Sequence, residues 1–503
     1  MADQITIGVV GAGTMGRGIV QLFAQAGHAV RCFDAQPGAA DAAVAQVVGM
    51  LQRSVDKGRL SADAFERIRT NIGVAPELGA LAGCGVVIEA IVEDLGVKRE
   101  LFRSLEAILG DDAVLATNTS SLTVSDIAAG CAKPARVAGL HFFNPVPLMK
   151  VAEVIAAVRT APATVQLLKA ITEGAGHRAV VTSDQPGFLV NHAGRGLYTE
   201  GLRVVEEQVA TPADVDDVLR EGMGFRMGPF ELLDLTGLDV SSRVMASIYE
   251  QFQQEPRFRP SSLVPPRVAA GLFGRKSGEG WYRYEGGQAV RPAARAVPAL
   301  AASLRVWVDP HAEQADELKA LATQAGVALV PRGAEADLCI VQPWGQDATS
   351  LALTLGLDPA RTVAVDPLTP FGLRRTLMLT TVTAAAVRDS AHALLASDGV
   401  AVTLINDSGG FIAQRVMATI VNIAANIAQR GIASVADLED AVKLGLGYPH
   451  GPLAWGDRIG PARILAILRA QQDATSDPRY RPSPWLVRRV ALGLPLVTPE
   501  APR

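Results

Sequence analysis

The sequence predicts an α/β domain built on a parallel sheet, an all-α domain after it, and then a second, weaker copy of the same pair. Three observations lead to this fold class. Residues 5–10 form a buried strand pattern and residues 29–33 a second strand, and they enclose a glycine-rich turn and a helical pattern, which together form a β-α-β unit. Helical spacing of apolar residues begins near residue 185. Segments of the first half then recur in the second half.

Length and composition bound the architecture and the partners. The chain has 503 residues, 49% of them apolar, and domains of about 100–200 residues predict roughly three to five of them. Lys and Arg (47) nearly balance Asp and Glu (51), and the two signs are interspersed, so nucleic acid is not an expected partner. The four cysteines lie far apart and form no C-x-x-C pair, so we expect neither disulfides nor a metal site.

No targeting or membrane segment is expected. The N-terminus carries an acid where a signal peptide carries basic residues. Charge-free stretches such as residues 416–429 are shorter than the ~20 residues that span a bilayer. We therefore expect a cytoplasmic protein.

The first β-α-β unit contains the pattern G-x-G-x-x-G directly after its first strand. The turn contains Gly11, Gly13, Thr14, Met15 and Gly16. Between a strand and a helix, such a turn holds a pyrophosphate through backbone N–H groups and the positive end of the helix dipole, and glycine permits the close approach. The alternative is a unit of this kind that has lost its ligand.

An acid at the end of the second strand indicates which dinucleotide binds. Asp34 can accept both hydroxyls of the adenosine ribose and would repel a 2′-phosphate. Arg31 precedes it on the strand, where it would not meet such a phosphate. NAD is therefore preferred over NADP.

Residues 39–70 are predicted to form two helices joined near Lys57, an insertion longer than an ordinary crossover. The charged tip of this hairpin, with Lys57 and Arg59, could meet the phosphates of a large substrate such as coenzyme A. An ordinary solvated helix surface explains the same residues equally well.

Polar side chains follow the next two strands, at the edge of a parallel sheet where ligands bind. Glu93 and Lys98 follow the strand at residues 85–89, and Lys98 lies in a helix. Asn118 and Ser120 follow the strand at residues 113–117. All four side chains should face the cofactor or the reacting bond.

The serines at 120 and 121 have a second interpretation. Either could cap the helix that is expected to start near Leu122. Both roles can hold, with a different serine in each.

A histidine and an acid are predicted to form a pair. The strand at residues 137–140 leads into His141, and Glu153 lies in the apolar run 151–155. A lone histidine is usually a hydrogen-bonded core residue, but a buried carboxylate is costly unless it is paired. Imidazole held by a carboxylate is suited to take a proton from an alcohol near neutral pH.

Together these motifs resemble the L-3-hydroxyacyl-CoA dehydrogenase family. The matching segments keep their order and spacing up to about residue 285, and they are residues 11–16, 88–94, 117–122, 141–149, 184–191, 228–234 and 274–282. The resemblance implies an α/β Rossmann-type NAD-binding domain followed by an all-α dehydrogenase domain. It also implies NAD-dependent oxidation of (S)-3-hydroxyacyl-CoA to 3-ketoacyl-CoA, as in fatty acid metabolism.

The resemblance also assigns roles by position. His141 would be the general base for the 3-hydroxyl, with Glu153 orienting it. Ser120 and Asn191 would donate hydrogen bonds to the reacting oxygen or to the thioester carbonyl. Asn144 would contact the substrate.

Glu93 and Lys98 match positions that the family places beside the nicotinamide ribose. The family commonly has Arg after the asparagine, whereas His192 follows Asn191 here. No arginine contact is therefore inferred at that point.

The second half repeats the first. Helices are expected at residues 188–205, 212–223 and 230–254. Four segments of this region recur later in the chain. Residues 187–188 correspond to 410–411, 222–231 to 445–453, Asp234 to Asp457, and 257–260 to 479–482.

The intervening segment, residues 304–404, is predicted to be a degenerate α/β domain. Strands are expected at residues 304–308, 338–341 and 362–365, but the glycine pattern is missing. Gln414 stands where the first copy has Asn191. No histidine followed by an acid replaces the first pair, so this copy is expected to be non-catalytic.

The expected organisation is therefore a series of four domains and one linker. These are a Rossmann domain with the helical hairpin (1–184), a helical dehydrogenase domain (185–290), a linker rich in Pro, Arg and Ala (291–303), the degenerate α/β domain (304–404) and a second all-α domain (405–503).

The resemblance also implies that single-copy members of the family form dimers through their helical domains. A tandem copy would supply that surface within one chain, as an internal pseudo-dimer with one active site, and a homodimer of the whole chain stays open. The tandem form resembles bacterial members that act on 3-hydroxybutyryl-CoA or, in phenylacetate catabolism, on 3-hydroxyadipyl-CoA. The second substrate is favoured; it differs by a terminal carboxylate.

The sequence argues against two other function classes. A non-catalytic NAD-binding or structural protein on the same scaffold predicts a broken pair, whereas His141, Glu153, Ser120 and Asn191 are all present. A different β-hydroxyacid dehydrogenase would require a catalytic lysine after the helical boundary. Residues 185–195 contain none.

Overall fold

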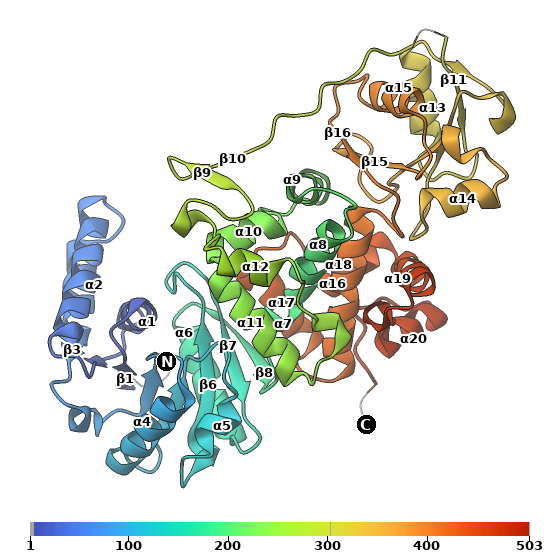
Figure 1. The fold of residues 1–503 in the computed structure, drawn as a ribbon. Helices are drawn as coiled ribbons and strands as arrows, with labels where there is room; N and C mark the ends of the chain where they lie inside the picture. Colours follow the sequence, from blue (N-terminus) through green and yellow to red (C-terminus); the bar gives the residue numbers. More distant parts are fainter. Residues whose placement is uncertain (1–4, 302, 502–503) are drawn as a thin grey trace. The chain divides into compact units, whose positions relative to one another are not determined.

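The computed structural model describes residues 5–301 and 303–501. They form two compact units (Figure 1). Of these described residues, the first unit contains those up to His192 together with Arg430–Leu446, and the second contains those from Ala193 to Gln429 and from Gly447 to the end of the described range. Each unit is described separately below.

The first unit is built on a sheet in which the described residues form eight strands in the order β3-β2-β1-β4-β5-β6-β7-β8. The strands are β1 (Ile7–Val10), β2 (Val30–Phe33), β3 (Ile72–Val74), β4 (Val86–Glu89), β5 (Val114–Thr117), β6 (Val137–Phe142), β7 (Val151–Ala156) and β8 (Arg178–Ser183). All neighbours are parallel except β6 and β7, which pair antiparallel. The predicted parallel sheet is confirmed.

Helices cover both faces of this sheet because its strands are apolar on both sides. They are α1 (Thr14–Gln25), α2 (Ala39–Asp56), α3 (Ala62–Asn71), α4 (Leu95–Ile108), α5 (Val124–Ala128), α6 (Pro162–Gly174) and α17 (Val435–Gly445). Val9 and Phe23 belong to the core on one face, and Val10 and Phe102 belong to the core on the other. The two helices expected over residues 39–70 are present as α2 and α3.

The second unit begins with the helical region. Its helices are α7 (Val190–Ala193), which crosses the boundary, α8 (Arg195–Glu206), α9 (Pro212–Asp217), α10 (Pro229–Thr236), α11 (Leu238–Gln251) and α12 (Val264–Ala269). The prediction of a single helix at 230–254 is wrong. Gly237, with φ 88°, ends α10, and α11 begins after it. Likewise, the expectation of one helix at 188–205 is wrong, because α7 and α8 are separate.

A second sheet follows. Its strands lie in the order β12-β11-β13-β14-β15-β16. They are β11 (Arg305–Val308), β12 (Ala328–Leu329), β13 (Leu338–Val341), β14 (Thr362–Val365), β15 (Arg375–Leu379) and β16 (Val402–Ile405). The helices of this part are α13 (Ala315–Gln324), α14 (Ala348–Thr354) and α15 (Ala385–Leu395). The three strands expected from the sequence are present.

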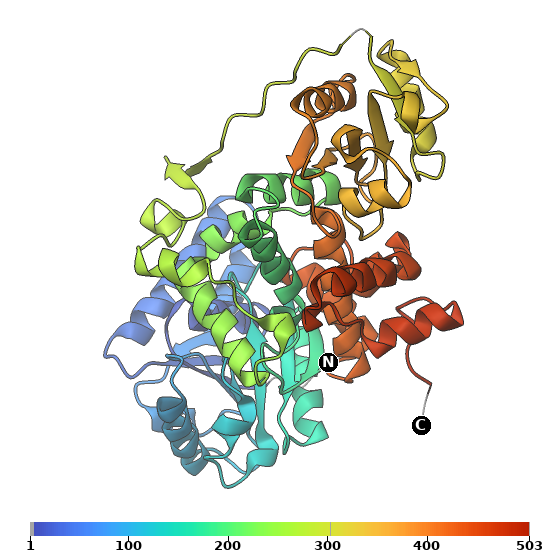
Figure 2. The same ribbon diagram turned by 45° about the vertical axis from the view of Figure 1, so that its right-hand side comes forward.

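Residues 291–301 contain neither helix nor strand and lead to this α/β part from the small hairpin of β9 (Arg283–Glu285) and β10 (Gln288–Val290) (Figure 2). The predicted linker at 291–303 includes residue 302, which lies outside the described residues.

The remaining helices are α16 (Ile412–Gln429), α18 (Pro452–Ile459), α19 (Pro461–Thr475) and α20 (Pro484–Leu492). Local features of the first helical region recur here. The Asp234 carboxylate accepts hydrogen bonds from the N–H groups of Trp281 and Tyr282 at 2.9 and 3.0 Å. Asp457 accepts in the same way from the two consecutive N–H groups at 496 and 497. Gly460, with φ 107°, separates α18 from α19 as Gly237 separates α10 from α11.

Helices α8 and α16 pack closely. A Cβ on Gly196 would lie 3.0 Å from the backbone of Ile420, so a larger residue there would push the two helices apart by a few tenths of an ångström. Arg415 of α16 donates to Glu200 of α8 at 2.7 Å, and both side chains are buried. This pair joins the first helical region to the repeat.

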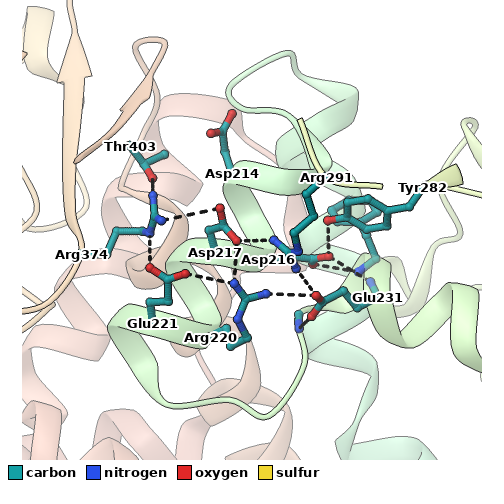
Figure 3. Close-up of polar contacts among 12 residues, drawn as sticks. Asp214, Asp216, Asp217, Arg220, Glu221, Glu231, Tyr282, Arg291, Arg374 and Thr403 are labelled. Carbon is teal, nitrogen blue, oxygen red and sulfur yellow. Dashed lines mark hydrogen bonds and ion pairs between the residues drawn. The ribbon is translucent and has the colours of Figure 1, made fainter. Parts of the chain in front are cut away.

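A cluster of ion pairs joins the first helical region to the second α/β part (Figure 3). Arg374 donates to Glu221 at 2.8 Å and to Thr403 at 3.0 Å. Arg220 contacts Asp217 and Glu221 at 2.9 and 3.0 Å, so the charges alternate across the cluster. Arg291 lies at its other end, 2.5 Å from Asp217.

Within the described ranges, none of the helices has the length and apolar character required to cross a membrane.

Candidate active site

A cavity of about 390 Å³ lies at the carboxyl ends of β4, β5 and β6, entirely within the first unit. Eight of the sequence-predicted site residues line it, and they are Met15, Glu93, Lys98, Asn118, Ser120, His141, Asn144 and Asn191. The position follows from the topology, because polar residues after parallel strands gather at one edge of the sheet.

His141 and Glu153 face each other across the antiparallel pair β6 and β7. Nδ1 of His141 lies 2.6 Å from Oε2 of Glu153. The other carboxylate oxygen accepts the N–H groups of Leu189 and Val190, each at 2.8 Å. Glu153 is fully buried and His141 is 6% exposed, so the acid is fixed on both oxygens and the ring is held by its Nδ1.

Packing also fixes the plane of the imidazole. The rings of Phe143 and Phe188 lie with their centroids 4.6 and 5.9 Å from that of His141. Because Glu153 accepts from Nδ1–H, the neutral ring carries its lone pair on Nε2. That nitrogen is the one that can accept a proton.

A buried charge cluster lies beside this pair. Lys98 donates to Glu89 at 2.6 Å and lies 3.3 Å from Glu93. Glu89 also accepts from the hydroxyl of Thr117 at 2.7 Å and from the N–H of Ile91 at 2.8 Å. The lysine is 1% exposed, and burial of such a charge requires close partners.

Glu93 holds the turn that contains the serines. Its Oε1 accepts from Thr119 Oγ1 at 2.6 Å, from Ser120 N at 3.1 Å and from Ser121 Oγ at 2.8 Å. Burial opposes ionisation of Glu93, but Lys98 and these hydrogen bonds outweigh it and lower its pKa below the ordinary value.

Glu89 was missed by sequence reasoning. The signal was available, because an acid at the end of the apolar strand β4 is the same feature that singled out Glu153 in β7. A buried acid in an apolar strand predicts a buried cationic or hydrogen-bonding partner wherever it occurs.

The expectation that one of the serines at 120 and 121 caps the next helix is wrong. Helix α5 begins at Val124, and no side chain at its N-cap residue forms the capping bond. Instead the carboxylate of Asp184 accepts from Val124 N at 2.9 Å and from Ser125 N at 2.7 Å. A distant acid therefore caps this helix, and Ser121 donates to Glu93 instead.

The asparagines lie where they were expected. Oδ1 of Asn118 accepts from the N–H of Phe142 at 2.8 Å, which ties the ends of β5 and β6 together. Asn144 and Asn191 line the cavity. Lys57 does not belong to the cavity lining; it is exposed at the end of α2.

The glycine turn has the shape that a dinucleotide requires. Gly11 has φ 109°, and a Cβ there would lie 2.4 Å from the carbonyl oxygen of Ala90. A Cβ on Gly16 would lie 1.8 Å from the oxygen of Gly11, whereas nothing lies within 4 Å of one on Gly13. Backbone atoms thus crowd the turn at Gly11 and Gly16, whereas the space beside Gly13, just before α1, is open.

Asp34 supports the turn. One carboxylate oxygen accepts from Ala12 N at 2.7 Å and the other accepts from Gln36 N at 2.9 Å. The half-buried carboxylate stands at the end of β2. These residues fit NAD, since the donors are backbone N–H groups and the acid excludes a 2′-phosphate.

Two family descriptions match this chain. The 3-hydroxyacyl-CoA dehydrogenase NAD binding domain matches residues 6–185. The C-terminal domain of the same family matches residues 187–284 and again residues 410–496. The chain belongs to the 3-hydroxyacyl-CoA dehydrogenase family. It is therefore an NAD-dependent oxidoreductase.

The similar proteins match either nearly the whole chain or about its first half. A 3-hydroxyadipyl-CoA dehydrogenase of Escherichia coli strain K12 is 37% identical over 497 residues, which are 98% of each chain. A probable 3-hydroxybutyryl-CoA dehydrogenase of Bacillus subtilis is 38% identical over 277 residues, which are 55% of this chain and 96% of that protein. A crystal structure of 3-hydroxybutyryl-CoA dehydrogenase from Escherichia coli K12 aligns with a TM-score of 0.86 at 35% identity, covering 97% of this chain and 99% of the other.

Proposed function

We propose that this dehydrogenase oxidises the 3-hydroxyl of an (S)-3-hydroxyacyl-CoA to the 3-ketoacyl-CoA, with His141 as general base. The observation that carries the proposal is the 2.6 Å contact between His141 and a fully buried Glu153 at the edge of a dinucleotide-binding sheet. A non-catalytic protein on this scaffold would have no reason to keep a buried acid paired with an imidazole at this edge.

Several residues would hold NAD. The turn containing Gly11, Gly13, Thr14, Met15 and Gly16 would bind the pyrophosphate through backbone N–H groups. Asp34 would bind the adenosine ribose and Asn118 would shape the floor beside the nicotinamide. Glu93 and Lys98 would face the nicotinamide ribose. NAD, when bound, supplies the acceptor for the hydride that leaves C3.

The proton goes to His141. Nε2 takes it from the 3-hydroxyl as the C3–H bond breaks, and the Glu153 carboxylate stabilises the imidazolium that forms. Hydrogen bonds to both oxygens of Glu153 would hold the acid in this orientation.

Ser120 and Asn191 would bind the substrate oxygens. Both line the cavity with His141, and donors held in place stabilise charge that develops on oxygen in the transition state. Asn144 would contact the acyl chain. The exposed Lys57 at the hairpin tip would bind a phosphate of coenzyme A; the alternative is that it belongs to an ordinary solvated helix surface.

The acyl group is either 3-hydroxyadipyl or 3-hydroxybutyryl, and we favour 3-hydroxyadipyl. Its support is the match over 98% of both chains to a protein named for that substrate. The two substrates differ by a terminal carboxylate, so initial rates with both CoA esters distinguish them.

The decisive experiment is NADH production from a panel of 3-hydroxyacyl-CoA esters, with His141→Ala as the control. The substitution is expected to lower the rate at least ~10²-fold, the usual effect of a positioned general base. A loss of less than about tenfold would assign the base to another residue.

We also propose the domain organisation 1–184, 185–290, 291–303, 304–404 and 405–503, with 304–404 a degenerate Rossmann-like copy. Matching hydrogen bonds support it. Ala157 N donates to Thr160 Oγ1 at 3.0 Å in the first copy, and Thr380 N donates to Thr383 Oγ1 at 2.8 Å in the second. Each copy also has a matching backbone hydrogen bond to the turn that precedes β6 or β14. Ala161 N donates to Ala135 O in the first copy, and Ala384 N donates to Ala360 O in the second.

The two helical copies would form an internal pseudo-dimer with one active site. The contact of Gly196 with Ile420 and the buried pair of Arg415 and Glu200 support this arrangement. A chain that ends near residue 285 is expected to expose apolar surface of α8 and to aggregate or dimerise. A monodisperse, fully active monomer in light scattering would contradict the pseudo-dimer.

A further inference from the structure

One segment of the second helical copy is part of the first unit. Residues 430–446, which include α17, lie within the second match to the family's C-terminal domain, yet they belong to the compact unit that contains the Rossmann sheet. The segment extends the edge of that sheet. Thr182 and Ala433 form an antiparallel bridge, and Ser183 N donates to Ile432 O at 2.9 Å.

Ion pairs attach α17 to the edge strand. Arg178, at the start of β8, donates to Asp437 at 2.6 Å and to Asp440 at 3.0 Å. All three side chains are partly buried, with exposed fractions of 29%, 15% and 34%. One guanidinium thus joins two acids that lie three residues apart on one face of the helix.

The end of α17 contacts the turn that holds Glu153. A Cβ on Gly445, the last residue of α17, would lie 3.0 Å from the methyl carbons of Val190. The N–H of Val190 donates to Glu153 at 2.8 Å, and the same carboxylate holds His141. Three contacts therefore connect the second copy to the imidazole, through Gly445, Val190 and Glu153.

The turn needs such support because its backbone is strained. Gly187 has φ 73° and Phe188 has φ 50°, and a bulky side chain is rare in that left-handed region. Strain of this kind persists only where the surroundings determine the conformation. Phe188 and Val190 are both buried, at 2% and 1% exposure.

We propose that residues 430–446 are a positioning element for the catalytic pair. The segment holds β8 through Arg178 and packs closely against Val190 at Gly445, which keeps the N–H groups of residues 189 and 190 aimed at Glu153. The proposal rests on the function proposed above. It gives the second copy a role in catalysis although it contributes no side chain to the cavity lining.

The test compares two glycines that both end helices of the first unit. Gly445→Leu pushes against Val190, whereas Gly174→Leu at the end of α6 meets nothing within 4 Å. We expect Gly445→Leu to lower kcat by about tenfold to 10²-fold, as misplacement of a catalytic group does. The pH profile of kcat should shift to lower pH because the displaced carboxylate stabilises the imidazolium less. Gly174→Leu should change neither.

NADH binding separates positioning from general damage. The Kd for NADH, followed by fluorescence, should stay unchanged in Gly445→Leu, since the glycine turn lies on β1 and α1. A purely structural role for α17 would lower the melting temperature but leave kcat and its pH profile unaltered below that temperature. That result would overturn the proposal.

A second variant covers the case in which Gly445→Leu does not fold. Asp437→Asn with Asp440→Asn keeps the shape of α17 and removes both of its charges that pair with Arg178, which keeps its 3.7 Å contact with Glu173. A lower kcat with unchanged NADH affinity supports the proposal, and wild-type kcat and pH profile in a folded protein refute it. If His141→Ala keeps its activity, the proposed function fails; if that variant is inactive while both α17 variants are normal, only this inference fails.

Discussion

The two α/β parts differ in the residues that face each other across their antiparallel strand pair. In the first part these are His141 and Glu153, whose side chains lie 2.6 Å apart. In the second part Asp366 and Thr376 occupy this place, where Asp366 N donates to Thr376 O at 3.1 Å. Neither is an imidazole, so of these two strand pairs only the first contains the proposed base.

The amide side chains at the corresponding positions Asn191 and Gln414 have different surroundings in the two copies. Asn191 lines an open cavity of about 390 Å³. Gln414 is fully buried, and its amide accepts from Gly345 N at 2.8 Å and donates to Pro343 O at 3.1 Å and to Asp366 at 2.9 Å. The amide of Gln414, which has one methylene more than that of Asn191, is thus fully engaged in contacts within the second part.

The largest expected difference is in cofactor binding. One chain should bind one NADH, and Gly16→Ala should abolish that binding because its Cβ would lie 1.8 Å from Gly11 O. Titration of NADH fluorescence gives both the stoichiometry and the loss. Gly174→Ala, where a Cβ meets nothing within 4 Å, is the control. Two NADH per chain would mean that the second α/β part still binds nucleotide.

The next largest effect concerns the acid of the pair. Glu153→Gln should lower kcat about 10²-fold, because an amide cannot accept from His141 and from the N–H groups of residues 189 and 190 at the same time. Thr376→Val, the matched change in the second part, should leave kcat unaltered. Equal effects in steady-state assays would remove the distinction between the two parts.

Much of the first site could be predicted from sequence because its residues occupy recognisable places. Glycines between a strand and a helix, and polar residues after parallel strands, converge by topology alone. His141 and Glu153 could be paired because a buried acid needs a partner. The same rule applied to Glu89 would have predicted its contact with Lys98, which is 2.6 Å long.

Other features depend on contacts that no local pattern encodes. The cap of α5 comes from Asp184, 60 residues away in the sequence. The break at Gly237 separates two stretches that both have helical spacing. The placement of α17 in the first unit depends on Arg178 meeting acids more than 250 positions later. Such long-range choices are made by tertiary packing, which overrides local propensity.

The buried hydrogen bonds of Gln414 predict a stability effect without a catalytic one. Gln414→Ala removes three buried hydrogen bonds, which join its amide to Gly345 N, Pro343 O and Asp366. Their loss should lower the unfolding free energy by about 1–3 kcal/mol. Gln324→Ala, at an exposed position at the end of α13, is the control. Urea unfolding measures the difference. A drop in kcat at unchanged stability would instead place Gln414 in a working site.

The smallest expected effect is the pH dependence of stability that Asp366 of the second part contributes. Burial raises the pKa of Asp366 to about 6 against hydrogen bonds from Leu368 and Gln414. The folded protein therefore holds this proton more tightly than the unfolded chain, so the stabilisation is complete below the ordinary Asp value of about 3.9 and is lost as pH rises towards 6.

Asp366→Asn cannot titrate, so the unfolding free energy of the variant should lack this decline, which is at most about 1.4 kcal/mol for each pH unit. Asp358→Asn is the opposite control, since the Ala360 N–H and Arg361 lower the pKa of Asp358 and its contribution is already complete above the ordinary value. Urea unfolding from pH 4 to 7 compares the three proteins. Parallel curves for wild type and Asp366→Asn would mean that Asp366 stays ionised, and that Gln414 and Leu368 alone offset the cost of burying its charge.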